Sequence, residues 1–290
     1  GIRKDYYQAS SVPRCFLDSE LQVSGNAAQP VTKTKLLNRY EVPAFAEIRG
    51  AFNMDENNVI TITADVASYI NITDLRTFIS VNEKTTTKNT VEYGGNGEKE
   101  FHHVMMKMLE NANGNTMSIN AGEYQHLEFS FDMSSTNVEE MNDLEVALWL
   151  QNYETMEIYN SHYAYQSDVH VHPVRNMSAE INGSDLKISW SAPEAGSPTG
   201  YNVSVNGVLE AENINTLEYI KTNANQTHKT AEVVAVYENG TSVAVAKIIT
   251  EGDNVTEIIA DNISIYPNPV KDFVKLSAIS GQLSVVKVYN

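Results

Sequence analysis

A short polar stretch near the middle of the chain places one carboxylate and two imidazoles at alternate positions, as Asp168, His170 and His172. Side chains alternate along a β-strand, so in a strand all three would face the same side. Zinc accepts imidazole and carboxylate ligands, and alternate residues about 6.5 Å apart are workable as two ligands of one ion. The commoner explanation of such a stretch is a polar strand face that ends at Pro173, and both interpretations remain open.

Three further groups of residues have side chains that could take part in chemistry. Asp55 and Glu56 begin a loop of oxygen ligands that suits calcium, but the loop lacks EF-hand spacing and also fits a plain turn. His102 and His103 are adjacent and would diverge by about 100° on a helix, which favours a capping or packing role. Cys15 is the single cysteine and lies in an apolar stretch, so we expect a buried, inert thiol.

The overall composition excludes several classes of function. The net charge is −17, which argues against nucleic acid and against bare anionic lipid as partners. A lone cysteine allows no internal disulfide, and no apolar run approaches the ~20 residues of a transmembrane helix. The sequence has no Gly-x-Ser-x-Gly elbow, Walker loop or His-Glu-x-x-His motif, which favours a non-enzymatic role and no cofactor, with calcium or zinc as the open exceptions.

Most of the chain shows the period-two alternation that is typical of strands. Residues 59–66, 127–131 and 145–151 alternate in this way, and loops rich in Asn and Gly separate them. Residues 149–159 have the pattern of a hairpin, whereas residues 101–109 are expected to form one or two helical turns. This spacing of strands predicts an all-β fold of tandem β-sandwiches.

The pattern restarts at Pro173. Residues 186–190 and 201–205 alternate, and the dipeptide Asn206-Gly207 then predicts a tight hairpin. The organisation that we expect is an N-terminal segment, a large sandwich, a smaller sandwich, a linker and a C-terminal segment, at residues 1–30, 31–172, 173–250, 251–262 and 263–290.

The C-terminal segment resembles the sorting domain of type IX secretion. That domain opens with Tyr-Pro-Asn-Pro and later contains a Val-x-Val-Tyr-Asn strand, although the family continues with further strands after that point. The resemblance implies export across both bacterial membranes and attachment to the cell surface. The residues that carry it are Tyr266, Pro267, Asn268, Pro269, Val288, Tyr289 and Asn290.

The smaller sandwich resembles a fibronectin type III or immunoglobulin-like module. The resemblance rests on Leu186-x-Ile188-x-Trp190, on Gly200-Tyr201-x-Val203 and on residues 233–240. It implies that Trp190 is the core indole between two sheets. Ala231 stands where such modules often have a tyrosine, and the fold by itself implies no chemistry.

Residues 12–18, 101–109 and 148–158 resemble secreted outer-membrane-associated proteins in which a thioredoxin-like domain precedes a β-rich domain. Residues 1–30 would then be a remnant of the thioredoxin-like domain, although no redox Cys-x-x-Cys is present.

Together these patterns predict a non-catalytic, secreted or cell-surface protein with a binding, adhesion or scaffold role. Its expected partners are the type IX secretion machinery and an extracellular protein or glycan. The alternative is that the chain is the non-catalytic C-terminal part of a thioredoxin-like thiol–disulfide oxidoreductase.

Overall fold

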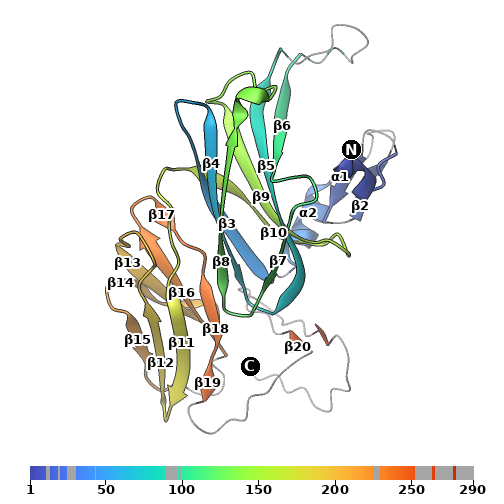
Figure 1. The fold of residues 1–290 in the computed structure, drawn as a ribbon. Helices are drawn as coiled ribbons and strands as arrows, with labels where there is room; N and C mark the ends of the chain where they lie inside the picture. Colours follow the sequence, from blue (N-terminus) through green and yellow to red (C-terminus); the bar gives the residue numbers. More distant parts are fainter. Residues whose placement is uncertain are drawn as a thin grey trace.

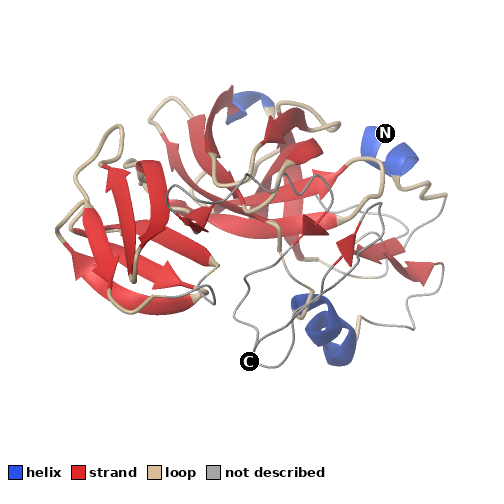
Figure 2. Ribbon diagram, turned by 90° about the horizontal axis from the view of Figure 1, so that it is seen from below, coloured by secondary structure: helices blue, strands red, loops and turns tan. Residues whose placement is uncertain are grey.

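The computed structural model describes residues 1–10, 14–18, 20–24, 31–42, 44–88, 97, 99–224, 229–251, 263–264 and 277–278. Strands make up most of the regular structure in this part of the chain, and the helices α1 (Ile2–Tyr6) and α2 (Lys33–Tyr40) lie at its periphery (Figure 2). The all-β expectation is confirmed, with two sandwiches that follow one another in the chain (Figure 1). None of the described helices is long and apolar enough to cross a membrane.

The first sandwich is drawn in blue to green in Figure 1. Its strands hydrogen-bond in the order β6-β5-β9-β10-β3-β4-β8, and β7 also pairs with β5. β10 pairs with β9 along most of its length, and its last residues, Tyr165 and Gln166, pair in parallel with β3. The strands are β3 (Ala46–Met54), β4 (Val59–Ser68), β5 (Ile72–Thr86), β6 (Phe101–Leu109), β7 (Asn115–Ile119), β8 (Tyr124–Asp132), β9 (Leu144–Asn152) and β10 (Ile158–Gln166); a short 3-10 helix, Met133–Ser135, follows β8.

Alternation along β4 separates a core face from an outward face. Ile60, Ile62 and Val66 are fully buried in the first core cluster, together with residues of β5 and β9. The side chains of the odd-numbered residues of β4 point the opposite way, so Asp65 faces away from that core. Because Asp65 pairs with Arg49 of β3, Glu47 and Arg49 share this outward face, which we call the junction face of β3, β4 and β8.

The expected helical turns over residues 101–109 are wrong, because this segment is strand β6. It pairs with the long strand β5 from Phe101 opposite Thr86 to Leu109 opposite Ile79, and the register shifts once on the way. Pairing with β5 satisfies the backbone hydrogen bonds and buries Met108 and Leu109, and this tertiary pairing outweighs the helix propensity of a Met-rich stretch.

The second sandwich is drawn in yellow to orange in Figure 1. One sheet has the order β15-β12-β11-β19, and the other has the order β14-β13-β16-β17 with β18 on β16. Asn206 and Gly207 both have positive φ angles, 49° and 73°, as the predicted hairpin turn requires. The strands are β11 (Arg175–Asn182), β12 (Asp185–Ser191), β13 (Gly200–Val205), β14 (Val208–Ile214), β15 (Glu218–Lys221), β16 (Thr230–Tyr237), β17 (Gly240–Thr241), β18 (Val245–Ile248) and β19 (Thr250–Glu251).

Trp190 lies in the core of the second sandwich, where sequence analysis expected it. Its side chain is 5% exposed, and its ring packs edge-on against Tyr201 with the ring centroids 5.4 Å apart. The second core cluster extends from Val171 to Val245, so it includes part of the segment that enters the sandwich.

Side chains of the junction face bind the second sandwich directly. Arg49 donates a hydrogen bond from a guanidinium nitrogen to the hydroxyl oxygen of Thr241 at 2.9 Å. The backbone N–H of Ala244 donates to the Glu47 carboxylate at 3.0 Å. The two sandwiches therefore meet in part across a polar contact, in which Arg49 and Glu47 each have a partner in the second sandwich.

The N-terminal segment also docks on the first sandwich. The guanidinium of Arg3 lies 4.3 Å from the ring centroid of Phe78 and 4.8 Å from the ring centroids of Tyr6 and Tyr7, and it donates to the side-chain oxygen of buried Gln151 at 3.0 Å. The strands β1 (Arg14–Leu17) and β2 (Glu20–Ser24) form a separate antiparallel pair.

The residues that resemble a sorting motif, Tyr266 to Pro269 and Val288 to Asn290, lie outside the described residues. In that part of the chain the structure describes only the short antiparallel pair of β20 (Ile263–Ser264) and β21 (Ser277–Ala278).

Candidate metal centre

The site begins with a buried carboxylate on the junction face. Asp65 is 2% exposed even though it faces away from the core of its own sandwich. The segment 167–174, which connects the two sandwiches, runs over this face and covers the carboxylate. A buried carboxylate is costly unless it is paired and hydrogen-bonded, so its partners decide what the site can do.

The first partner comes from the neighbouring strand. His126 of β8 stands directly opposite Asp65 in the antiparallel pairing of β4 and β8. Its Nδ1 lies 2.9 Å from Oδ1 of Asp65, and its side chain is about one third exposed at the rim of the site. In the described part of the chain no hydrogen bond is made by the other ring nitrogen, Nε2, which could bind a second group.

The second partner comes from the connecting segment. Nε2 of His170 lies 2.8 Å from Oδ2 of Asp65, and the His170 side chain is 11% exposed. Neither ring nitrogen of His170 makes a well-directed hydrogen bond within the described part of the chain, although both are buried. Buried nitrogens of this kind are expected to have a partner, and a metal ion is one that would satisfy them.

A third imidazole closes the group. The ring of His172 packs edge-on against that of His170 with centroids 4.2 Å apart, and it lies 5.7 Å from the ring of His126. The hydroxyl of Tyr237, on β16 of the second sandwich, donates to the backbone carbonyl oxygen of His172 at 2.8 Å. Both sandwiches therefore position the histidines of the connecting segment.

The electrostatics follow from these contacts. Burial acts to raise the pKa of Asp65, but the contacts with His126 and His170 outweigh it, and the pKa lies below its ordinary value. The bond to Asp65 raises the pKa of His126, whereas burial and the neighbouring His170 lower the pKa of His172. Burial raises the pKa of Tyr237 to about 12, so this phenol remains a donor at neutral pH.

The donor set suits a divalent transition metal. One ligand atom from each of Asp65, His126 and His170 can be chosen so that all three lie within 4.8 Å of one another, and within the described residues this is the one such group. Zinc binds imidazole nitrogen and carboxylate oxygen at about 2.0–2.2 Å, so modest side-chain rotations would bring the three atoms onto one ion. His172 lies beside this group, with its ring against that of His170.

Sequence analysis had grouped Asp168, His170 and His172 on one strand face. The structure has no regular strand over residues 167–174, and Asp168 is exposed outside the cluster, whereas His170 and His172 converge. Sequence analysis missed Asp65 and His126, which are 61 residues apart. The signal that was available is the single acidic residue of the strand, Asp65, which follows Thr61 and Thr63 on one face while the other face is apolar from Ile60 to Val66.

The proposed calcium loop has a local structural role. Oδ1 of Asp55 accepts hydrogen bonds from the backbone N–H groups of Asn57 and Val59, at 2.9 and 2.8 Å, and so closes the turn between β3 and β4. These bonds lower the pKa of Asp55. Glu56 is exposed beside it.

His102, His103 and Cys15 lie apart from the junction. His102 contacts Glu100 at 3.0 Å, and His103 contacts Glu145 at 2.7 Å, both on the exposed surface of β6. Cys15 is a free, partly buried thiol on β1.

Comparisons with known proteins give distant structural similarities. No protein-family model matches the sequence, and no curated protein is detectably similar to it. HBP35 of Porphyromonas gingivalis is similar at 12% identity and a TM-score of 0.45, over 85% of this chain and 77% of that one. A Fn3-like protein from Clostridium thermocellum aligns over 30% of this chain and 100% of its own length, at 18% identity and a TM-score of 0.27. The dimeric latent PorU of Porphyromonas gingivalis aligns over 78% of this chain and 26% of its own, at 9% identity and a TM-score of 0.23.

Proposed function

We propose that the chain is a non-catalytic, extracellular scaffold or binding protein whose two sandwiches are fastened by a divalent transition metal. The ligands are Asp65, His126 and His170, and His172 completes the set. The observation that carries this proposal is the convergence of the first three side chains within 4.8 Å, around a buried carboxylate that would otherwise be held only by imidazoles.

The metal has a structural role in this proposal. Asp65 and His126 belong to the first sandwich, whereas His170 and His172 belong to the segment that enters the second. An ion bound by both pairs would pin the connecting segment to the junction face and would limit rotation between the sandwiches. Structural metal sites contribute their binding energy to the stability of the folded arrangement.

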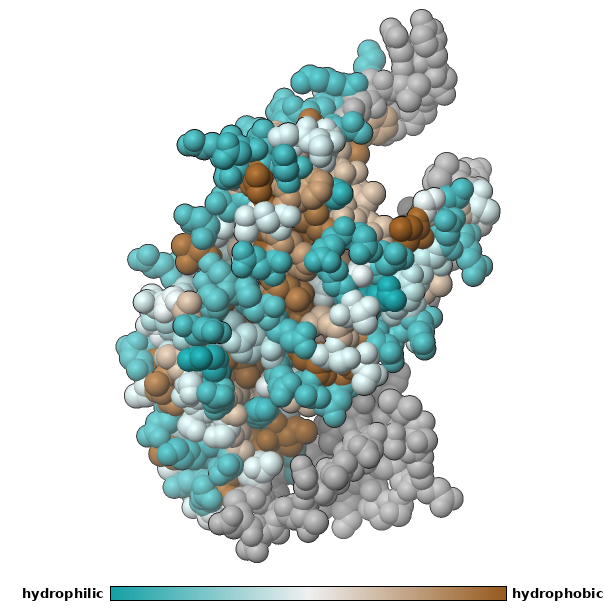
Figure 3. All heavy atoms as spheres, viewed as in Figure 1, coloured by the Kyte–Doolittle hydropathy of each residue, from teal (hydrophilic) through white to brown (hydrophobic). Residues whose placement is uncertain are grey.

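The extracellular part of the proposal is supported by the sequence of residues 263–290, which resembles a type IX sorting domain. The secretion machinery would be the partner for export, and an extracellular protein or glycan would be the ligand of the exposed module. The face drawn in Figure 3 suits an exposed position, because it is largely hydrophilic and its apolar side chains occur singly or in small groups. Thiol–disulfide exchange by a cysteine pair within these 290 residues is excluded, since they contain one cysteine and such exchange uses two.

Metal binding is tested on the metal-free protein by titration calorimetry with zinc and by thermal unfolding with and without zinc. We expect binding at one site per chain and an increase in the free energy of unfolding, about 2.7 kcal/mol at a zinc concentration of 100 Kd. Asp65→Asn and His126→Ala should each weaken zinc binding at least tenfold.

The matched control is His162→Ala, which removes an exposed histidine of β10 outside the cluster. It should bind zinc as the unmodified chain does, and calcium should not replace zinc. If Asp65→Asn and His126→Ala bind zinc as tightly as the control, the metal lies elsewhere and the proposal is wrong.

A further inference from the structure

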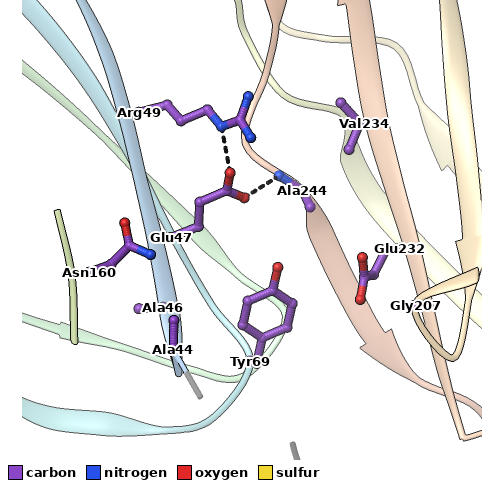
Figure 4. Close-up of a pocket in the computed structure, with 10 residues that line it drawn as sticks. All are labelled: Ala44, Ala46, Glu47, Arg49, Tyr69, Asn160, Gly207, Glu232, Val234 and Ala244. Carbon is purple, nitrogen blue, oxygen red and sulfur yellow. Dashed lines mark hydrogen bonds and ion pairs between the residues drawn. The ribbon is translucent and has the colours of Figure 1, made fainter. Parts of the chain in front are cut away.

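A second site lies on the same junction face and includes none of the proposed metal ligands. A cavity of about 450 Å³ opens between the two sandwiches. Figure 4 shows Glu47, Arg49 and Tyr69 on its first-sandwich wall and Glu232, Val234 and Ala244 on its second-sandwich wall. This volume is within the usual range of small-molecule sites.

One of the two carboxylates in the cavity is already neutralised. Glu47 accepts a hydrogen bond from Nε of Arg49 and another from the backbone N–H of Ala244 (Figure 4). Arg49 in turn reaches Thr241. This pair is therefore a closed contact between the sandwiches and has little capacity left for a further ligand.

The other carboxylate has no such partner. Glu232 of β16 points into the cavity in Figure 4, and no described side chain or N–H group donates to its carboxylate. Burial, and then the negative charge of Glu47, raise the pKa of Glu232 to about 7. The cavity thus contains a carboxyl group that has no paired cation to stabilise its ionised form.

The rest of the lining is suited to a small ligand with one polar end. The phenol of Tyr69 and the amide of Asn160 line the cavity with groups that donate and accept hydrogen bonds, and burial raises the pKa of Tyr69, which stays protonated. The remaining lining residues are small or apolar, Ala44, Val234 and Ala244 among them. These leave room for a short aliphatic stem.

We propose that this cavity binds a primary ammonium group on a short aliphatic stem, with the carboxylate of Glu232 as its ion-pair partner and Tyr69 and Asn160 as hydrogen-bonding neighbours. The ammonium supplies the positive charge that Glu232 lacks, and the alanine and valine walls cover the stem. An anionic ligand is disfavoured, because Glu47 and Glu232 both face the space and Arg49 is committed to Glu47. This site is independent of the proposed metal.

The probe is n-butylammonium, titrated into the full chain at pH 8 and followed by nuclear magnetic resonance, with n-butanol as the neutral probe of the same length. We expect saturable binding of n-butylammonium and none of n-butanol. Glu232→Gln keeps the size of the side chain but removes the charge, and it should weaken binding at least tenfold. Glu238→Gln, an exposed change just beyond the same strand, is the matched control and should bind normally.

A second arm uses the peptide acetyl-Gly-Lys-Gly-amide. If the peptide also shifts the resonances in a manner that depends on Glu232, the natural ligand is a lysine side chain of a partner. If only n-butylammonium does so, the ligand is a free amine. If n-butylammonium fails to bind the unmodified chain, or binds folded Glu232→Gln equally well, the proposal is overturned.

Discussion

The phenol of Tyr237 in the second sandwich donates a hydrogen bond to the backbone carbonyl oxygen of His172, at 2.8 Å. This contact ties strand β16 to the connecting segment at the residue that completes the histidine cluster. Removing only the hydroxyl, in Tyr237→Phe, should leave the core ring in place but free the carbonyl. Groups that orient metal ligands typically contribute 10–100-fold to metal affinity. We expect a smaller loss of zinc affinity, about three- to tenfold, because this hydrogen bond holds the backbone of His172 and not its imidazole ring.

Titration calorimetry with zinc measures this effect. Tyr163→Phe removes the hydroxyl of an exposed tyrosine on β10 and is the control. Equal zinc affinity of the two variants would mean that the second sandwich does not position the cluster.

Trp190→Ala should destabilise the second sandwich by about 3–5 kcal/mol, because it removes a large side chain from a packed core. Trp190→Phe should cost less, since the indole N–H has no hydrogen-bond partner in the described part of the chain and its loss leaves no acceptor unpaired. Denaturant unfolding followed by circular dichroism checks both values. A cost below about 1 kcal/mol for Trp190→Ala would contradict the buried position of the ring.

Glu232 should make stability depend on pH between about 4.5 and about 7. The folded protein retains a proton on Glu232, whose pKa is raised to about 7, whereas the unfolded chain loses it near the ordinary value of 4.5. The stabilising contribution is therefore complete below pH 4.5 and is lost as the pH rises through about 7, with a total of about 1–3 kcal/mol. Arg49, Glu47 and Tyr69 face the same space and are unchanged in this test.

The measurement is the free energy of unfolding of Glu232→Gln and of the unmodified chain at pH 5 and at pH 8. The variant should gain stability relative to the unmodified chain as the pH rises. A difference that stays constant between the two pH values would show that Glu232 ionises normally.

Arg3→Ala should loosen the N-terminal segment and destabilise the first sandwich by about 1–3 kcal/mol, since it removes a partly desolvated cation from several aromatic rings. Trp149 stacks on Phe78, with ring centroids 5.1 Å apart, and Arg3 lies 6.0 Å from the Trp149 ring centroid. The change should therefore also alter tryptophan fluorescence. Lys4→Ala, at an exposed neighbour, is the control, and identical behaviour of both variants would contradict the docked position of Arg3.

Export should depend on the C-terminal segment. The chain, expressed behind an export signal that delivers it to the periplasm of a bacterium that has type IX secretion, should reach the cell surface or the medium. A version that ends at Asn262 should remain in the periplasm and stay folded, because both core clusters lie before residue 250. Cell fractionation with an antibody to the first sandwich tests this. Surface display of the shortened protein would show that the resemblance to sorting domains is misleading.

Local patterns predicted much of the fold, because most strands have one buried and one exposed face. Residues 59–66 alternate, and the structure places them in β4 with Ile60 and Ile62 buried. The dipeptide Asn206-Gly207 predicted a hairpin because few other residues accept its backbone angles. Residues 101–109 were misassigned since their partner, β5, is distant in sequence and overrides local propensity.

The candidate site could be predicted only in part for the same reason. His170 and His172 are neighbours in sequence, so their proximity follows from the extended backbone. Asp65 and His126 meet because β4 pairs with β8 in one register, and a shift of one residue would separate them. No local sequence pattern specifies that register. No local pattern specifies either that Glu232 of the second sandwich approaches Glu47 of the first.

The way in which β10 ends has a mechanical consequence. After Gln166, the backbone N–H of Ser167 donates to the carbonyl oxygen of Phe52 on β3 at 3.0 Å, and the chain then passes Asp65 and Tyr237. Tension applied through the second sandwich is therefore transmitted to β3 and β4 as well as to β10. Several strands share the load, so a pulling force on the distal module would have to break these lateral contacts before it could peel β10 from its sheet.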